Sequence, residues 1–286
     1  MTAAPRPGLP PPVRGRAQCG PGLLLIAHGS RDRRHARAIA VLAEAVRANL
    51  PGTAVQTGFL SLSEPSVGEA YRRLLGGAGG GEVAGTTGAM SATGGGDGCG
   101  AVESVGGVPG GSRAVRVVPL FLRAGYHVQH DVPAAVAEAR RACPFADEVT
   151  VAAALGPDPL LAESFDRRIR EAGCWPDDPE LELVPAGATR QTEVDPAALA
   201  APHPPGIRRR LVLARFLAPG ELPDRARARA AAAGVPITEP LISESLGPAE
   251  ELVRLVLARY FGDEHDGEPD APHRHTTTQG PLIPSG

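Results

Sequence analysis

The stretch LLLIAHGSRD, residues 23 to 32, decides the fold class of this chain. Its first five residues form a short, continuous apolar run, which is the pattern of a strand buried on both faces of a parallel sheet. The run stops at His28, and Gly29 and Ser30 then turn the chain into a charged segment. Ligands bind at the carboxyl ends of the strands in open parallel sheets. The sequence therefore predicts that His28 lies at a ligand-binding edge.

Apolar runs and amphipathic segments alternate downstream of this stretch. The expected strands are 23–27, 54–60, 115–122 and 148–155, and the expected helices are 32–49, 65–75, 131–142 and 156–173. We expect Asp131 to cap the third helix, with Pro133 in its first turn. Alternation of this kind predicts an α/β fold with a parallel sheet, right-handed crossovers and helices on both faces.

Three segments carry too little apolar area to offset the entropy of ordering them. We expect a disordered leader at 1–21, a flexible glycine-rich insertion at 76–112 and a disordered tail at 263–286. The leader has no apolar core, so it is neither a signal peptide nor a membrane span, which predicts a cytoplasmic protein. The tail contains His265, His273 and His275, for which a solvated tail and a metal-gathering tail both stay open.

The second half of the chain repeats the first in reduced form. The stretches LELVPAGATR (181–190), RLVLARFLAPG (210–220) and LGPAEELVRLVLARY (246–260) echo segments of the first half in the same order. Two tandem α/β domains at 22–174 and 175–262 explain this repetition, each a small parallel sheet flanked by helices and the second one degenerate. In the second half, Ala186 occupies the position that matches His28, and Leu222 the position that matches His127. The loss of both histidines together fits a shared function for the pair.

Composition excludes several classes of function. All 29 basic residues are arginine, so Schiff-base chemistry and lysine-dependent phosphate sites are excluded. The four cysteines include no C-x-x-C pair and therefore predict no zinc or iron–sulfur framework. A formal charge of -3 without a long basic block predicts no nucleic-acid partner.

Two histidines at neighbouring strand ends suggest a metal site. His127 follows the third strand by a few residues, and in the common strand order 2-1-3-4 the first and third strands are neighbours, about 4.8 Å apart. Two imidazoles placed there can converge on one ion. Neutral imidazole is a borderline-soft metal ligand and a base with a pKa near ~6.5. A hydrogen-bonded structural role is the alternative for each histidine, and we expect such a role, or an exposed position, for His35 and His130.

Three motifs together resemble the CbiX/SirB-type sirohydrochlorin chelatases, the class II tetrapyrrole metal chelatases. They are AHGSRD near the N-terminus, GFLSLSEPSV after the second strand and VPLFLRAGYHVQHDVP after the third. The resemblance is strong over 22–172 apart from the insertion, and weak over 180–261. It implies two tandem chelatase-like domains, with the active site in 22–174, and a lyase in which His28 and His127 hold the incoming metal and help to remove protons.

The resemblance also implies the partners and the substrate-binding residues. The partners are sirohydrochlorin and a divalent metal ion, Fe²⁺ or Co²⁺, without ATP, further cofactor, nucleic acid or membrane, in a monomer or homodimer. Sirohydrochlorin carries many carboxylates, so we expect arginines and backbone amides at the pocket rim. The candidates for substrate binding are Gly29, Ser30, Arg31, Arg123 and Gly125. Both arginines could equally be solvated surface residues.

The carboxylate of the site is less clear from the sequence. Glu64 is a candidate acid or partner of the metal site, and an acidic residue stabilised by a helix start is the alternative. Relatives often carry an acidic residue nearer Phe59, where this chain has Ser61.

The metal and the activity also leave alternatives open. The motif wording favours Fe²⁺ and sirohaem synthesis, with a cobaltochelatase of the anaerobic cobalamin pathway or a non-catalytic metal- or tetrapyrrole-binding protein as alternatives. A histidine phosphatase is disfavoured because Ala27 stands where that family has arginine. A serine hydrolase is disfavoured because Ser30 lacks the G-x-S-x-G elbow.

Overall fold

The computed structural model describes residues 20–76, 114–187 and 192–262. The leader, the glycine-rich insertion and the histidine-containing tail expected from the sequence lie outside these ranges, apart from residues 20, 21 and 76. No helix in the described part of the chain is long and apolar enough to cross a membrane.

The first unit is built on a four-stranded parallel sheet with the order β2-β1-β3-β4. The strands are β1 (Gly22–Ala27), β2 (Val55–Phe59), β3 (Ala114–Pro119) and β4 (Glu148–Val151). The predicted α/β fold and strand order are confirmed, so β1 and β3 are hydrogen-bonded neighbours. β3 and β4 end three to four residues earlier than expected because the chain leaves the sheet after Pro119 and Val151.

Buried side chains on both faces of β1 hold the helices against the sheet. Leu23 and Leu25 belong to the core on one face, whereas Leu24 and Ile26 belong to the core on the other. All four side chains are fully buried. This explains why the strand reads as a continuous apolar run rather than as an alternating one.

Four helices connect or follow these strands: α1 (Arg33–Ala48), α2 (Val67–Leu75), α3 (Val132–Ala142) and α4 (Pro159–Glu171). Asp32 and Asp158 cap α1 and α4, and Ser66 forms a capping box with Glu69 at α2. Asp131 stands at the N-cap position of α3, as predicted, with a proline in the first turn, but its side chain makes no cap hydrogen bond. A π-helical turn, η1 (His127–Asp131), precedes α3, and the Asp131 side chain contacts His127 instead.

The second unit has a smaller parallel sheet of two strands, β5 (Leu181–Ala186) and β6 (Arg209–Ala214). The short helix α5 (Pro196–Ala200) and the helix α6 (Glu221–Ala232) accompany it. A small antiparallel pair, β7 (Ile242–Ser243) and β8 (Gly247–Pro248), leads into α7 (Glu250–Phe261). The described part of the chain therefore contains the predicted tandem arrangement with a reduced second unit.

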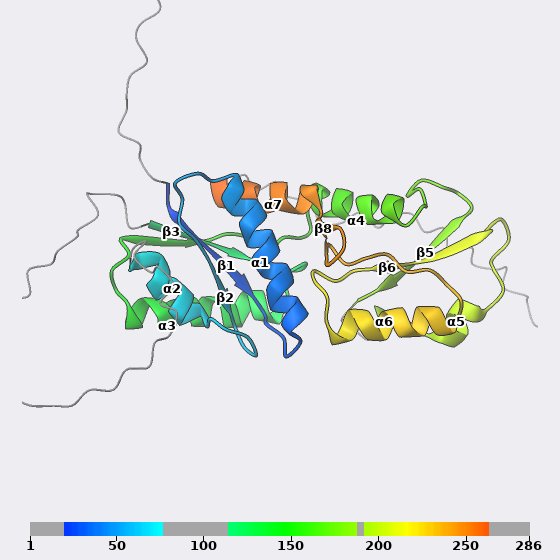
Figure 1. The fold of residues 1–286 in the computed structure, drawn as a ribbon, viewed down its shortest axis with the longest axis horizontal. Helices are drawn as coiled ribbons and strands as arrows, with labels where there is room; N and C mark the ends of the chain where they lie inside the picture. Colours follow the sequence, from blue (N-terminus) through cyan, green and yellow to red (C-terminus); the bar gives the residue numbers. More distant parts are fainter. Residues whose placement is uncertain (1–19, 77–113, 188–191, 263–286) are drawn as a thin grey trace, which may run out of the picture.

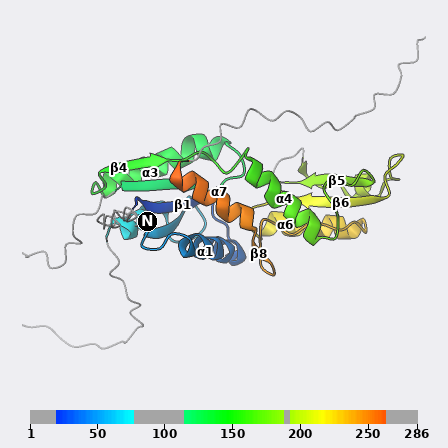
Figure 2. The same cartoon turned by 90° about the horizontal axis from the view of Figure 1, so that it is seen from above.

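The two units exchange their last helices. α7 follows the second unit in sequence but lies over the first sheet, where Leu252, Leu255 and Val256 join the core that contains Leu23 (Figure 1). α4 follows the first sheet, yet its Ile169 packs against Leu211 of β6. Figure 2 shows the two helices next to each other. The packing thus crosses the sequence boundary at residue 174.

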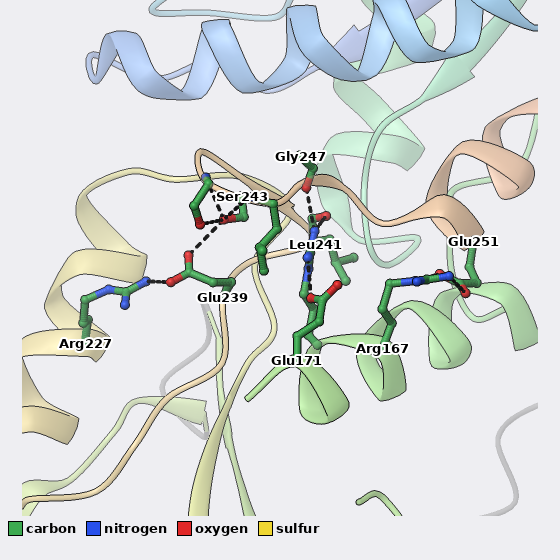
Figure 3. A network of polar contacts seen from close by, with 11 residues as sticks. Arg167, Glu171, Arg227, Glu239, Leu241, Ser243, Gly247 and Glu251 are labelled. Atoms are coloured by element: carbon green, nitrogen blue, oxygen red, sulfur yellow. Dashed lines mark hydrogen bonds and ion pairs between the residues drawn. The ribbon is translucent and has the colours of Figure 1, made fainter. Parts of the chain in front are cut away.

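A buried arginine of α4 stabilises this exchange of helices. The fully buried Arg168 of α4 donates to the carbonyl oxygens of Leu241 at 2.7 Å and Gly247 at 2.6 Å, and it pairs with Glu171 at 2.6 Å. Figure 3 shows this polar network between α4 and the segment that leads to α7. The segment that returns from the second unit to the first is therefore fixed by side chains of α4.

Candidate active site

His28 leaves the carboxyl end of β1 in a tight contact with the loop after β2. The Ser61 amide donates to the His28 carbonyl at 3.0 Å. Gly29 has φ of 94°, and a Cβ placed on it would lie 1.7 Å from the Ser61 carbonyl oxygen. Only glycine fits this close approach and this left-handed backbone. Gly29 therefore fixes the direction in which the chain presents His28.

The structure brings the two predicted histidines together. The ring centroids of His28 and His127 are 4.5 Å apart, and the ring planes are inclined at 43°. The Phe121 ring stacks near His127 at 6.1 Å. The pair lies at the carboxyl edge of the neighbouring strands β1 and β3, where the order of the sheet changes direction.

Asp131 orients the second imidazole. Its Oδ2 lies 2.5 Å from Nδ1 of His127, in a half-exposed pair one helical turn apart. A carboxylate can only accept, so Nδ1 carries the proton and Nε2 keeps its lone pair. The sequence analysis missed this role, although the spacing of His127 and Asp131, four residues apart, was a signal that both side chains share a helix face.

The surroundings keep His28 neutral. Burial lowers the pKa of His28 below its ordinary value of 6.5, and the neighbouring His127 lowers it further, while Asp131 acts in the opposite direction. A neutral imidazole at neutral pH can bind a metal ion or accept a proton. Within the described ranges no group of three or more His, Cys, Asp or Glu side chains is arranged to hold a metal ion. The histidine pair by itself supplies two nitrogen ligands.

The histidine pair opens into a cavity of about 360 Å³ between the two units. The first unit contributes Ala27, His28, His35, Leu120, Phe121, Leu122, Arg123, Gly125, His127, Val128, Leu161 and Phe165. The second unit contributes Gly187, Thr192, Arg215, Phe216 and Leu217. The walls are mostly apolar with a few polar side chains, the usual character of a site for an organic ligand.

The predicted substrate-binding residues divide into two groups. Arg123 and Gly125 line the cavity, whereas Gly29, Ser30 and Arg31 are not among its lining residues. The Ser30 amide, a candidate donor to the substrate, donates to the Ser63 hydroxyl at 3.0 Å. The N-terminus of α1 is likewise already capped by the Asp32 carboxylate.

Glu64 does not join the histidines. It is exposed and outside the cavity lining, close to Glu69 at the start of α2. The carboxylate that the structure places at the histidine pair is Asp131.

The structure adds two side chains that the sequence analysis did not place in the cavity. His35 of α1 lines it, and burial lowers the pKa of His35. Arg215, at the end of β6, reaches the cavity from the second unit. Neither position follows a recognisable motif, and Arg215 enters the site only because the two units face each other.

The fold, a parallel sheet that faces a reduced second unit, is similar to that of solved chelatase structures. The sirohydrochlorin chelatase SirB from Bacillus subtilis subspecies spizizenii, solved with cobalt, has a TM-score of 0.56 at 15% identity over 85% of this chain and 94% of its own. SirB from Bacillus subtilis with Fe³⁺ has a TM-score of 0.57 at 15% identity. The similarity covers 84% of this chain and 94% of the SirB chain. DR2241 from Deinococcus radiodurans has a TM-score of 0.51 at 17% identity, over 87% of this chain and 56% of its own. It is described as structurally similar to chelatases.

The family assignment comes from the sequence of the first unit. Residues 22–79 and 108–172 match the CbiX family model. The chain therefore belongs to the CbiX family through its first unit, and its fold is that of the SirB structures. The part of 22–172 left out of the match lies inside the predicted glycine-rich insertion. No curated protein matches the chain.

Proposed function

We propose that this protein is a lyase that inserts a divalent metal ion into sirohydrochlorin, with His28 and His127 as the groups that handle the metal and the protons. The observation that carries the proposal is the pair of imidazole rings, 4.5 Å apart, at the mouth of a cavity lined by both units. Membership of the CbiX family and the shared fold with a sirohydrochlorin chelatase support the choice of substrate.

The reaction exchanges one divalent metal ion for the two protons of the pyrrole nitrogens. The metal ion is a substrate, and imidazole nitrogens replace part of its water shell. As the ion passes to the macrocycle, each released imidazole is free to accept one pyrrole proton. The two imidazoles thus supply two ligands to the metal ion before its transfer and accept two protons after it. General-base assistance of this kind contributes roughly 10²- to 10⁴-fold in rate.

Asp131 gives the two histidines different properties. Its contact with Nδ1 of His127 leaves Nε2 as the nitrogen that can bind the metal ion. Among the described residues no carboxylate makes such a contact with His28, whose pKa is lowered by burial and by the neighbouring His127. We therefore infer that His28 readily returns its proton to water.

The residues of the AHGSRD and GFLSLSEPSV motifs favour Fe²⁺ as the metal, which would make the product sirohaem. A cobaltochelatase of cobalamin synthesis is the second candidate, because imidazole accepts both ions. A protein that binds metal or tetrapyrrole without turnover is the third. The reduced second unit is the observation that keeps this non-catalytic candidate open.

Anaerobic mixing of the purified protein with sirohydrochlorin and Fe²⁺ or Co²⁺ tests the proposal. The visible spectrum should change to that of the metallated macrocycle faster than without protein, and the relative rates for the two ions identify the metal. Insertion at the protein-free rate with both ions, together with tight binding of the macrocycle, would establish the non-catalytic candidate instead.

A further inference from the structure

The second unit places one cation in the cavity at the end of its own strand. Arg215 follows the last residue of β6, and its amide donates to the carbonyl of Ala186, the last residue of β5, at 2.7 Å. Arg215 thus stands at the carboxyl edge of the small sheet, just as His28 stands at that edge of the large one. Both side chains line the same cavity.

Aromatic packing positions the Arg215 side chain. Its guanidinium carbon lies 5.9 Å from the centroid of the Phe165 ring. Phe165 belongs to α4, the helix that crosses from the first unit to the second, and it is buried in the first core while it also lines the cavity. A guanidinium over a ring face is held by a cation–π interaction and keeps its N–H groups available for an anion.

No acidic side chain in the described part of the chain neutralises Arg215. Most other arginines of the second unit are paired: Arg208 with Glu180, Arg209 with Asp178, Arg210 with Glu182, Arg225 with Glu221, Arg227 with Glu239 and Arg229 with Glu193. Arg123, the other arginine of the cavity, also has no carboxylate partner among the described residues. Two uncompensated cations at one cavity favour an anionic ligand.

In the echo between the two units, Arg215 has no arginine at the matching position of the first unit. When RLVLARFLAPG is aligned with VRVVPLFLRAG, Arg215 falls opposite Leu120, and Arg123 falls opposite Ala218. Each unit therefore carries its cavity arginine at a different position relative to its strand. The second unit lacks the histidine of the first unit and has a cation of its own at the shared cavity.

We propose that Arg215 binds a peripheral carboxylate of the tetrapyrrole, so that the reduced second unit supplies a substrate-binding wall opposite the catalytic first unit. This inference rests on the proposed function for the identity of the substrate. Arg215 and Arg123 then hold an anionic macrocycle from both units while its ring nitrogens face the histidine pair. Arginine suits this task because its planar fork matches a carboxylate in a bidentate contact.

Direct binding of sirohydrochlorin without metal tests this role separately from catalysis. We expect R215Q to raise Kd about 10-fold, which corresponds to about 1.4 kcal/mol of lost binding free energy. R215K should recover part of the loss. The matched control is R208Q, which removes an exposed arginine of the same unit outside the cavity. R208Q should bind as the wild type does.

Salt and charge dependence provide a readout that a purely structural role would not change. The difference in Kd between wild type and R215Q should shrink as ionic strength rises, and it should be larger for an octacarboxylate porphyrin than for a dicarboxylate one. Metal insertion by R215Q should show a raised KM with kcat nearly unchanged. Circular dichroism on each variant verifies the fold.

The outcomes separate this inference from the proposed function. Wild-type binding with the expected loss in R215Q supports the arginine role even when no metal is inserted. Equal Kd values for wild type, R208Q and R215Q, in a protein that inserts metal, overturn the arginine role and leave the chelatase function intact. Failure of the wild type to bind the macrocycle at all overturns both.

Discussion

The imidazole rings of His28 and His127 lie 4.5 Å apart because β1 and β3 are adjacent in the sheet, with Ile26 paired to Pro119. His28 follows β1 directly, whereas His127 lies in η1, after the loop that follows β3, so the distance between the rings is set by the sheet together with this loop. A site built this way depends on the glycine turn after β1 and on the helical turn after β3.

Asp131→Asn should lower the rate of metal insertion by about 10- to 100-fold without loss of the fold. The amide can donate to Nδ1 of His127 and so favours the wrong tautomer, and loss of such an oriented partner typically has an effect of this size. E138Q on the exposed face of α3 is the matched control. An unchanged rate in D131N would show that the contact at 2.5 Å has no role in turnover.

Gly29→Ala should destabilise the protein more than Gly52→Ala does. Both glycines have positive φ, at 94° and 82°, so each alanine costs about 1–2 kcal/mol of backbone strain. Gly52 has open space around it, whereas a Cβ on Gly29 meets the Ser61 carbonyl and adds about 1–3 kcal/mol. Urea unfolding of both variants measures the difference. Equal losses would mean that the loop moves aside without cost.

Arg168→Met should destabilise the exchanged arrangement of helices. The variant leaves the carbonyls of Leu241 and Gly247 without their donor, and each buried unpaired carbonyl costs about 1–3 kcal/mol. R170M, in the exposed last turn of the same helix, serves as the control. Thermal unfolding should show a clear drop in Tm for R168M and almost none for R170M. A comparable Tm for the two variants would refute the proposed anchoring.

The pKa of His28 should lie below 6.5 in the metal-free protein. Burial and the proximity of His127 both disfavour the charged ring, so His28 stays neutral down to a more acidic pH than a free histidine. An NMR titration of the imidazole resonances measures this value, and the H127A variant should bring it closer to 6.5. A midpoint above 6.5 in the wild type would contradict the lowered pKa of His28.

Much of the fold could be predicted from local sequence. The apolar run of β1 and the echo of the second half each follow from short-range patterns. The role of the Asp131 side chain could not be predicted, because aspartate is a good cap residue by type, and only the structure shows that this side chain contacts His127 instead. The exchange of helices could not be predicted either. Leu252 packs in the core that contains Leu23, and Ile169 packs against Leu211, and both pairings join residues that are far apart in the sequence.

The candidate site divides in the same way. His28 and His127 were found because each follows a strand end in a motif, and the predicted strand order then placed them together. Arg215 and His35 were missed because a cavity between two units has no local signature. The Ser30 amide was predicted as an anion donor from its place before a helix, and the Ser63 side chain that occupies it comes from another loop.

The most direct test of the central claim is the anaerobic rate of metal insertion into sirohydrochlorin by wild type, H28A and H127A at the same concentration of folded protein. We predict that the wild type exceeds the protein-free rate and that each variant loses most of that excess while it retains the wild-type circular dichroism spectrum. Insertion by H28A or H127A at the wild-type rate would contradict the claim that this histidine pair carries the reaction.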